Sequence, residues 1–208
     1  MAFELDTPHG PARVHLESVD GATTALVLGH GAGGGVGAPD LVAAAEAAEG
    51  LGITVALVEQ PYRVAGRRSP APATQLDAAW TAVIGQLRGD ALSGLALITG
   101  GRSAGARVAC RTAADAGAVA VLCLAFPLHP PGKGDDPTKS RLAELGAVEV
   151  PVLVVQGERD PFGMPPEGPN RTVVRVPGNH SLRSAAAVKA AVSEWLAAIA
   201  SPAPTEAP

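Results

Sequence analysis

Residues 95–114 constrain the fold more than any other stretch of this 208-residue sequence. The stretch begins with the apolar run 95–98, typical of a short buried strand, and ends with small residues compatible with a helix to about residue 116. The junction between them, Gly101-Arg102-Ser103-Ala104-Gly105, matches the pattern G-x-S-x-G. A serine on such a corner projects above the sheet in a strained conformation, and flanking glycines avoid collisions with neighbouring backbone. We predict a nucleophile at Ser103, with a purely structural glycine turn as the alternative.

The rest of the chain alternates between apolar segments and helical patterns. Further buried strands are predicted at residues 24–28, 53–58, 119–126, 150–155 and 172–176. Helices are predicted at residues 38–50, 76–87, 139–145 and 188–199. Residues 13–17 alternate in polarity and are predicted to form an antiparallel edge strand. This order predicts an α/β fold, a mostly parallel sheet covered by helices on both faces as a three-layer α/β/α sandwich.

Composition places the sequence among globular proteins. Hydrophobic residues make up 47% and charged residues 17% of the chain. We expect one domain over residues 1–200 and a disordered tail at residues 201–208, where proline and alanine dominate. The net charge of −4 offers no electrostatic attraction for nucleic acid or an anionic membrane, so we expect neither as a partner. The oligomeric state is left open.

The N-terminus and the two cysteines bear on location and cofactors. Residues 1–10 lack the basic head and apolar core of a signal peptide, and no apolar run approaches the length of a membrane span. We therefore expect a cytoplasmic protein. Cys110 and Cys123 fall in a predicted helix and a predicted strand, so we interpret them as buried small hydrophobes, not as a disulfide or a metal site. We predict no metal and no cofactor.

Two residues after later strands complete a possible catalytic set with Ser103. A serine hydroxyl is a poor nucleophile until a base, normally a histidine oriented by a carboxylate, takes its proton. Asp160 follows one predicted strand and His180 follows the next. Because the carboxyl ends of parallel strands share one edge of the sheet, we predict that Ser103, Asp160 and His180 meet there as a triad.

Five motifs along the chain carry a resemblance to a known family. They are GHGAGG, GGRSAGARVA, FPLHPPGK, QGERDPFG and GNHSL, and they span residues 29–182. They resemble the α/β-hydrolase superfamily, above all small bacterial relatives of dienelactone hydrolase, a group that includes the testis-expressed hydrolase-like proteins. The resemblance implies a minimal, lidless fold with fewer than the usual eight strands, and a serine hydrolase acting on small carboxylic esters or thioesters. Dienelactone hydrolase itself carries cysteine where this chain has Ser103, so its specific activity is not implied.

The order nucleophile, acid, histidine is typical of α/β-hydrolases and ranks the competing residues. Asp135 and Asp136 are rival acids, but their proline- and glycine-rich loop predicts solvated side chains. His9 and His15 precede the nucleophile and look like surface residues. His129 precedes Asp160 and breaks the expected order. Asp160 could otherwise be a turn residue before proline, and His180 an exposed loop histidine.

The tetrahedral intermediate of acyl transfer requires two hydrogen-bond donors for its oxyanion. One is predicted to be the backbone N–H of Ala104, directly after the nucleophile. Gly29-His30-Gly31-Ala32-Gly33 resembles the HG-containing oxyanion loop of esterases, and this match assigns the N–H of Ala32 as the second donor. His30 is interpreted as a residue that shapes this loop, not as a base.

Two rival functions remain open at this point. The loop also satisfies G-x-G-x-x-G, as Gly29-x-Gly31-x-x-Gly34, with Glu59 closing the next strand, which imitates a dinucleotide-binding Rossmann fingerprint. That hypothesis leaves Ser103, Asp160 and His180 unexplained. The third hypothesis is a non-catalytic interaction protein on a hydrolase fold.

Basic residues near the predicted site raise the question of substrate charge. Arg63, Arg67 and Arg68 follow a parallel strand, Arg102 adjoins the nucleophile, and Lys133 lies in the loop after the next strand. Arginine offers a planar fork to carboxylates, so this set could bind an acidic group of the substrate. The alternative is that these residues are solvated or form structural ion pairs.

Overall fold

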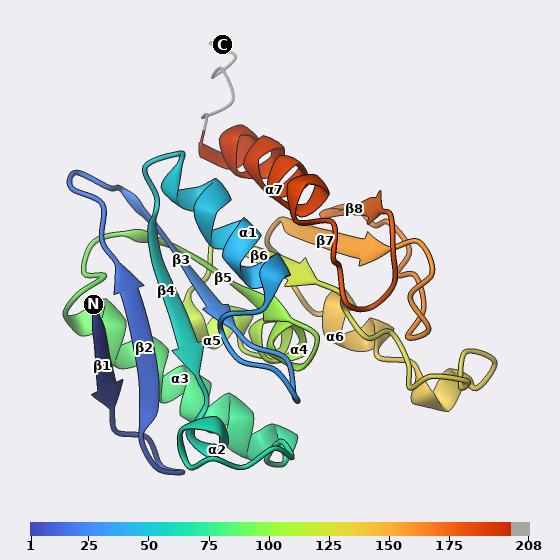
Figure 1. The fold of residues 1–208 in the computed structure, drawn as a ribbon, viewed down its shortest axis with the longest axis horizontal. Helices are drawn as coiled ribbons and strands as arrows, with labels where there is room; N and C mark the ends of the chain where they lie inside the picture. Colours follow the sequence, from blue (N-terminus) through green and yellow to red (C-terminus); the bar gives the residue numbers. More distant parts are fainter. Residues whose placement is uncertain (201–208) are drawn as a thin grey trace.

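A mixed sheet of eight strands forms the middle layer of the protein (Figure 1). In this computed structural model, which describes residues 1–200, the strand order is β1-β2-β4-β3-β5-β6-β7-β8. Neighbours from β4 to β8 are parallel, whereas β1 pairs with β2 and β2 with β4 in the antiparallel sense. Residues 201–208, predicted to be a disordered tail, lie outside the described residues.

Strands and helices alternate along the chain after residue 24. The strands are β1 (Ala2–Leu5), β2 (Ala12–Glu17), β3 (Thr24–Gly29), β4 (Thr54–Glu59), β5 (Ala96–Arg102), β6 (Ala120–Leu124), β7 (Val152–Gly157) and β8 (Arg171–Val176). The helices are α1 (Pro39–Glu49), α2 (Pro61–Val64), α3 (Ala73–Gly89), α4 (Ala104–Arg111), α5 (Ala113–Ala116), α6 (Leu142–Gly146) and α7 (Ala185–Ala200), with one 3-10 turn, η1 (Pro137–Lys139).

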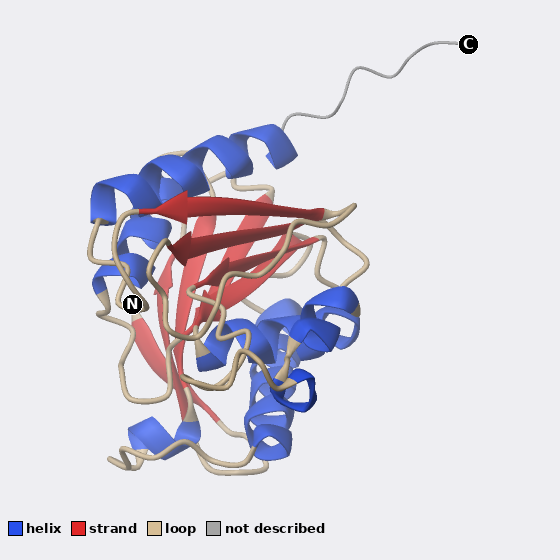
Figure 2. Ribbon diagram, turned by 90° about the vertical axis from the view of Figure 1, so that its right-hand side faces the viewer, coloured by secondary structure: helices blue, strands red, loops and turns tan. Residues whose placement is uncertain are grey.

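The central strands bury side chains on both faces, which explains their continuous apolar sequences. In β3, Leu26 and Leu28 pack in the core beneath α1 and α7. Ala25 and Val27 point the opposite way, into the core beneath α3, because successive side chains alternate across a strand. Helices lie on both sides of the sheet in Figure 2. The predicted three-layer α/β/α sandwich is therefore confirmed.

The N-terminal region corrects two predictions. The sheet has eight strands, so the expectation of a reduced sheet is wrong. Residues 12–17 do form an antiparallel strand, but β1 and not β2 is the edge. Strand β1 escaped prediction because it is four residues long, with no fully buried side chain to give an apolar pattern.

The helix after Ser103 also differs from the prediction. It is divided at Thr112, whose φ of −109° lies outside the helical range and whose hydroxyl donates to the carbonyl of Val108 at 2.8 Å. Cys110 in α4 and Cys123 in β6 are free and buried, as predicted, with their sulfur atoms 3.4 Å apart.

Two connections lie at the carboxyl ends of the parallel strands and decide how exposed that side of the sheet is. Residues 125–141 join β6 to α6 as a loop that holds only η1, so no lid domain is inserted there. Residues 60–72, which join β4 to α3, contain the short helix α2. Within residues 1–200, none of the helices combines the length and apolar character that a membrane span requires.

Candidate active site

Ser103 occupies a strained corner between β5 and α4. Its φ of 51° and ψ of −106° lie where residues other than glycine are rarely found. The backbone N–H of Ser103 donates to the carbonyl of Leu124 at the end of β6, at 2.9 Å. The predicted strand-turn-helix corner is present, and such strain at a defined site is typical of functional residues.

The two glycines that flank Ser103 allow β3 and α4 to touch. A Cβ on Gly101 would lie 2.5 Å from the carbonyl oxygen of Gly29 and 2.8 Å from the carbonyl carbon of Gly105. A Cβ on Gly105 would collide with the backbone of Gly29 and lie 2.9 Å from the carbonyl oxygen of His30. Any larger residue at either position would therefore push the helix away from the sheet.

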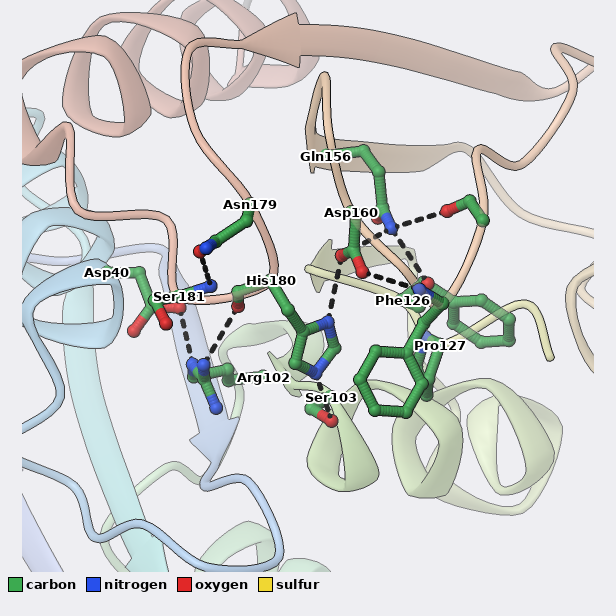
Figure 3. A network of polar contacts seen from close by, with 12 residues as sticks. Asp40, Arg102, Ser103, Phe126, Pro127, Gln156, Asp160, Asn179, His180 and Ser181 are labelled. Atoms are coloured by element: carbon green, nitrogen blue, oxygen red, sulfur yellow. Dashed lines mark hydrogen bonds and ion pairs between the residues drawn. The ribbon is translucent and has the colours of Figure 1, made fainter. Parts of the chain in front are cut away.

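A chain of hydrogen bonds joins Ser103, His180 and Asp160 (Figure 3). His180 Nε2 lies 2.9 Å from Ser103 Oγ, and His180 Nδ1 lies 2.8 Å from Asp160 Oδ2. An ionised carboxylate can only accept, so Nδ1 carries a proton and donates it to Asp160. In the neutral ring, Nε2 is then free to accept the hydroxyl proton of Ser103.

The carboxylate of Asp160 is buried and held by two further donors. Its side chain is 1% exposed, Gln156 Nε2 donates to Oδ2 at 2.9 Å, and the N–H of Phe162 donates to Oδ1 at 2.9 Å. The ring of Phe162 packs on the imidazole of His180, with ring centroids 4.1 Å apart. Sequence reasoning did not single out Gln156 and Phe162, although both belong to the QGERDPFG motif.

The rival acids and histidines lie elsewhere. Asp136 accepts hydrogen bonds from the N–H and hydroxyl of Thr138, and Asp135 is exposed in the same loop. His129 is hydrogen-bonded to the carbonyl of Pro130. His15 pairs with Glu59 at 2.6 Å, and His9 is exposed.

His30 is buried and shapes the loop after β3, the role predicted for it from the sequence. Its Nε2 accepts from the N–H of Gln60 at 3.0 Å, so its Nδ1 carries the proton and donates to the carbonyl of Gly31 at 2.8 Å. Because a trans peptide directs its C=O and N–H in opposite directions, this bond also fixes where the N–H of Ala32 points. Burial lowers the pKa of His30 below its ordinary value.

Replacing His30 by glutamine is expected to flatten the dependence of stability on pH. A depressed folded-state pKa means that the unfolded chain binds the proton first as pH falls below 6.5. The free energy of unfolding of the wild type should therefore fall below that pH, by up to about 1.4 kcal/mol per pH unit from this group. Urea unfolding between pH 8 and pH 5 measures it, with His9→Gln as the exposed control. A stability gap between wild type and His30→Gln that stays constant with pH would contradict the prediction.

The two alanines assigned to the oxyanion border the same cavity as Ser103. This cavity has a volume of about 280 Å³. The carbonyl of Ala32 accepts the hydroxyl of Tyr62 at 2.9 Å, which holds the loop from its other side, and Ala104 is the first residue of α4. The lining residues are Ala32, Pro70, Ala71, Ala73, Leu76, Ser103, Ala104, Arg107, Arg111, Pro127, Arg141 and Phe162.

Arg102 is engaged in hydrogen bonds within the protein. Its Nε donates to Asp40 Oδ2 at 2.7 Å, and its Nη2 donates to the carbonyl of His180 at 2.9 Å, as Figure 3 shows. Asp40 is fully buried, and this burial raises the pKa of its carboxyl group while the Arg102 charge opposes the rise. Arg102 thus links α1 to the loop that carries His180.

The other basic residues considered from the sequence also stand apart from this cavity. Within residues 1–200, the lining of the Ser103 cavity includes neither Arg102 nor any of the other four basic residues considered. Arg67 and Arg68 line an adjoining hollow that shares Pro70 and Ala71 with it. The side chain of Arg63 reaches the carbonyl of Arg67 at 3.4 Å, and Lys133 lies exposed in the loop after β6.

Three other arginines, which sequence reasoning missed, do line the cavity: Arg107, Arg111 and Arg141. The signal for two of them was available, since Arg107 and Arg111 lie four and eight residues after Ser103. That spacing places them on the same face of a helix as Ser103.

The glycines that match the dinucleotide-binding pattern have protein neighbours at two of the three positions. A Cβ on Gly29 would lie 3.2 Å from the Trp80 ring, and a Cβ on Gly31 would lie 2.7 Å from Arg102 Nη1. A Cβ on Gly34 would meet no atom within 4 Å. Glu59, the expected ribose-binding acid, is paired with His15.

Comparisons with known proteins agree with this geometry. The family model of the alpha/beta hydrolase domain matches residues 22–200. None of the curated proteins is significantly similar to the chain. Among solved structures, XC6422 from Xanthomonas campestris, an α/β serine hydrolase without a lid, is 22% identical, with a TM-score of 0.72 over 94% of each chain.

Two further structures have similar folds. Est1E from Butyrivibrio proteoclasticus is 17% identical, with a TM-score of 0.75 over 96% of this chain and 99% of its own. Dienelactone hydrolase from Anabaena variabilis is 18% identical, with a TM-score of 0.72 over 95% of this chain and 96% of its own. At these identities the structures show a shared fold. Its strand order differs from that of the Rossmann fold, on which the dinucleotide-binding hypothesis depended. Because the family model covers most of the sequence, the chain belongs to the α/β-hydrolase superfamily.

Proposed function

We propose that the protein is a serine hydrolase that cleaves small carboxylic esters or thioesters through an acyl-enzyme on Ser103. The observation that carries this proposal is the hydrogen-bond chain from Ser103 through His180 to Asp160, set on a strained corner beside a cavity. Family membership and the fold shared with a serine hydrolase and with Est1E support it.

In this mechanism Ser103 Oγ attacks the acyl carbon while His180 Nε2 takes its proton. Asp160 keeps the imidazole in the required tautomer and stabilises the imidazolium that forms. The N–H groups of Ala32 and Ala104 stabilise the oxyanion of the tetrahedral intermediate. As the intermediate collapses, the leaving alcohol or thiol takes the proton from His180. Water then repeats the sequence on the acyl-enzyme, with His180 as base, and releases the acid.

Trapping the intermediate tests this proposal directly. Ester hydrolysis is stopped with acid during steady turnover, and the protein is digested and analysed by mass spectrometry. The expected result is an acyl adduct on the peptide that contains Ser103. An adduct on another residue would overturn the mechanism. If neither an acyl group nor a fluorophosphonate labels the folded protein, the non-catalytic hypothesis would replace the proposal.

The absence of a lid between β6 and α6 leads to a prediction about acyl-chain length. The cavity of about 280 Å³ has room for a short acyl group, and residues 125–141 supply no cover for a long one. We expect kcat/KM to be higher for acetyl and butyryl esters than for the dodecanoyl ester. The nitrophenyl ester series measures this, and lipid droplets should give no interfacial activation. A dodecanoyl ester that is hydrolysed faster than the butyryl ester would contradict the prediction.

A further inference from the structure

One wall of the Ser103 cavity carries a cluster of guanidinium groups. Arg107 and Arg111 project from α4, one and two helical turns beyond Ser103, and Arg141 immediately precedes α6. All three border the cavity together with Ser103 and Ala104. Positive charge is therefore concentrated beside the nucleophile.

Two of these arginines are held by carboxylates outside the lining. Arg107 donates through Nε and Nη2 to both oxygens of Glu144, at 2.8 and 2.6 Å. Arg111 donates in the same two-pronged way to Asp77, at 2.8 and 2.7 Å, and its Nη1 lies 3.3 Å from Glu144. Such paired bonds fix both guanidinium planes before any ligand arrives.

Arg141 is the arginine without a carboxylate. Its Nη1 donates to the carbonyl of Pro127 at 2.9 Å, and within residues 1–200 it forms no ion pair. The positive charges of the three arginines are thus balanced by only two carboxylates, those of Asp77 and Glu144. One net positive charge is left at the cavity wall. Burial, and next the neighbouring charge of Arg107, lower the pKa of Arg141. A monoanion in the cavity would balance this charge, and a carboxylate matches the planar fork of the guanidinium.

We propose that Arg141, supported by Arg107 and Arg111, binds a free carboxylate of the substrate, so that the preferred substrates are esters or thioesters that also carry a carboxylic acid. This inference rests on the proposed hydrolase function and names its substrate class. It assigns recognition of the acid to the arginines that line the Ser103 cavity, in place of Arg67 and Arg68, which the sequence had suggested.

Matched pairs of esters test the preference. One pair places the charge on the acyl side, 4-nitrophenyl hydrogen adipate against 4-nitrophenyl adipamate. The other places it on the alcohol side, 4-acetoxybenzoate against 4-acetoxybenzamide. In each pair a carboxylate is compared with a neutral amide of the same shape, and the rate with Ser103→Ala protein is subtracted. We expect kcat/KM to favour the acid in at least one pair by about tenfold to a hundredfold, the usual range for a hydrogen bond to a charged group.

Variants then assign the preference to Arg141. Arg141→Gln should reduce the acid-to-amide ratio of kcat/KM to near one. Arg141→Lys keeps the charge without the fork and should give an intermediate ratio. Arg175→Gln, on β8, removes the same charge from an exposed position and should leave the ratio unchanged. A wild-type ratio near one in both pairs, or a ratio that survives Arg141→Gln, would overturn the proposal.

A binding measurement separates this inference from the hydrolase proposal. Calorimetry on folded Ser103→Ala protein should give a lower Kd for adipamate or 4-hydroxybenzoate than for the corresponding neutral amide. Arg141→Gln should abolish this difference in Kd. If the wild type hydrolyses neither pair but this binding is present, the hydrolase proposal fails and acid binding stands. Hydrolysis of both pairs without preference, and equal binding of acid and amide, overturns acid binding alone.

Discussion

Replacing Ser103 by alanine is expected to lower kcat for ester hydrolysis by about 10⁴- to 10⁶-fold, because the acyl-enzyme route then has no nucleophile. His180→Ala should cause a loss of similar size. The double variant should be little worse than either single variant, since the two residues act as one unit. Ser103 and His180 are only partly buried at the edge of the sheet, so both variants should fold.

Steady-state kinetics with a short-chain nitrophenyl ester measure these losses, and circular dichroism verifies folding. Ser93→Ala is the matched control, because Ser93 is an exposed serine near the opposite end of β5. It should retain wild-type turnover. A folded Ser103→Ala protein with wild-type turnover would show that the mechanism is wrong.

Replacing Asp160 by asparagine is expected to lower kcat by about 10⁴-fold, the loss measured for the equivalent change in a serine protease. The reason lies in the surrounding donors. Oδ2 of Asp160 accepts from Gln156 and His180, and Oδ1 accepts from the N–H of Phe162, whereas an asparagine has only one side-chain oxygen. If that oxygen faces His180, the neutral amide no longer stabilises the imidazolium. If it faces Phe162, the NH₂ group points towards His180. His180 would then have to accept at Nδ1 and carry its proton on Nε2, where it cannot take the proton of Ser103.

The same short-chain ester assay measures the effect of this change. Asp135→Asn removes one negative charge from the exposed loop after β6 and serves as the control, which should leave kcat unchanged. If Asp160→Asn kept more than about a tenth of the wild-type kcat, another group would have to orient His180. The roughly 10⁴-fold expectation would then fail.

Local patterns were sufficient to predict the strands and the corner that hold Ser103. Apolar runs fixed the parallel strands, since these strands are buried on both faces and tolerate few polar residues. The G-x-S-x-G pattern located Ser103 because the corner demands glycine at residues 101 and 105. Asp160 and His180 could be selected because each directly follows a strand. The hydrogen bonds of Figure 3 are the geometry that this selection anticipated.

Contacts between distant segments were beyond such reasoning. The partner of Arg102 is Asp40, which lies 62 residues earlier and becomes a partner only when α1 packs beside the end of β5. Helical spacing puts Arg107 on the face of Ser103, although sequence reasoning did not single it out. Whether that face borders a cavity depends on how residues 70–76 and 127–141 fold around it.

The contact of Gly29, Gly101 and Gly105 has a consequence for motion within the site. The loop with Ala32 begins at Gly29, and the helix with Ser103 begins beside Gly105, so both segments leave from one point of direct backbone contact. A displacement of Ser103 relative to this loop would have to separate α4 from β3, a central strand of the sheet. Openings of that kind have free energies near that of global unfolding, whereas loop tips open readily. The spacing between Ser103 and the loop with Ala32 is therefore set when the sheet folds.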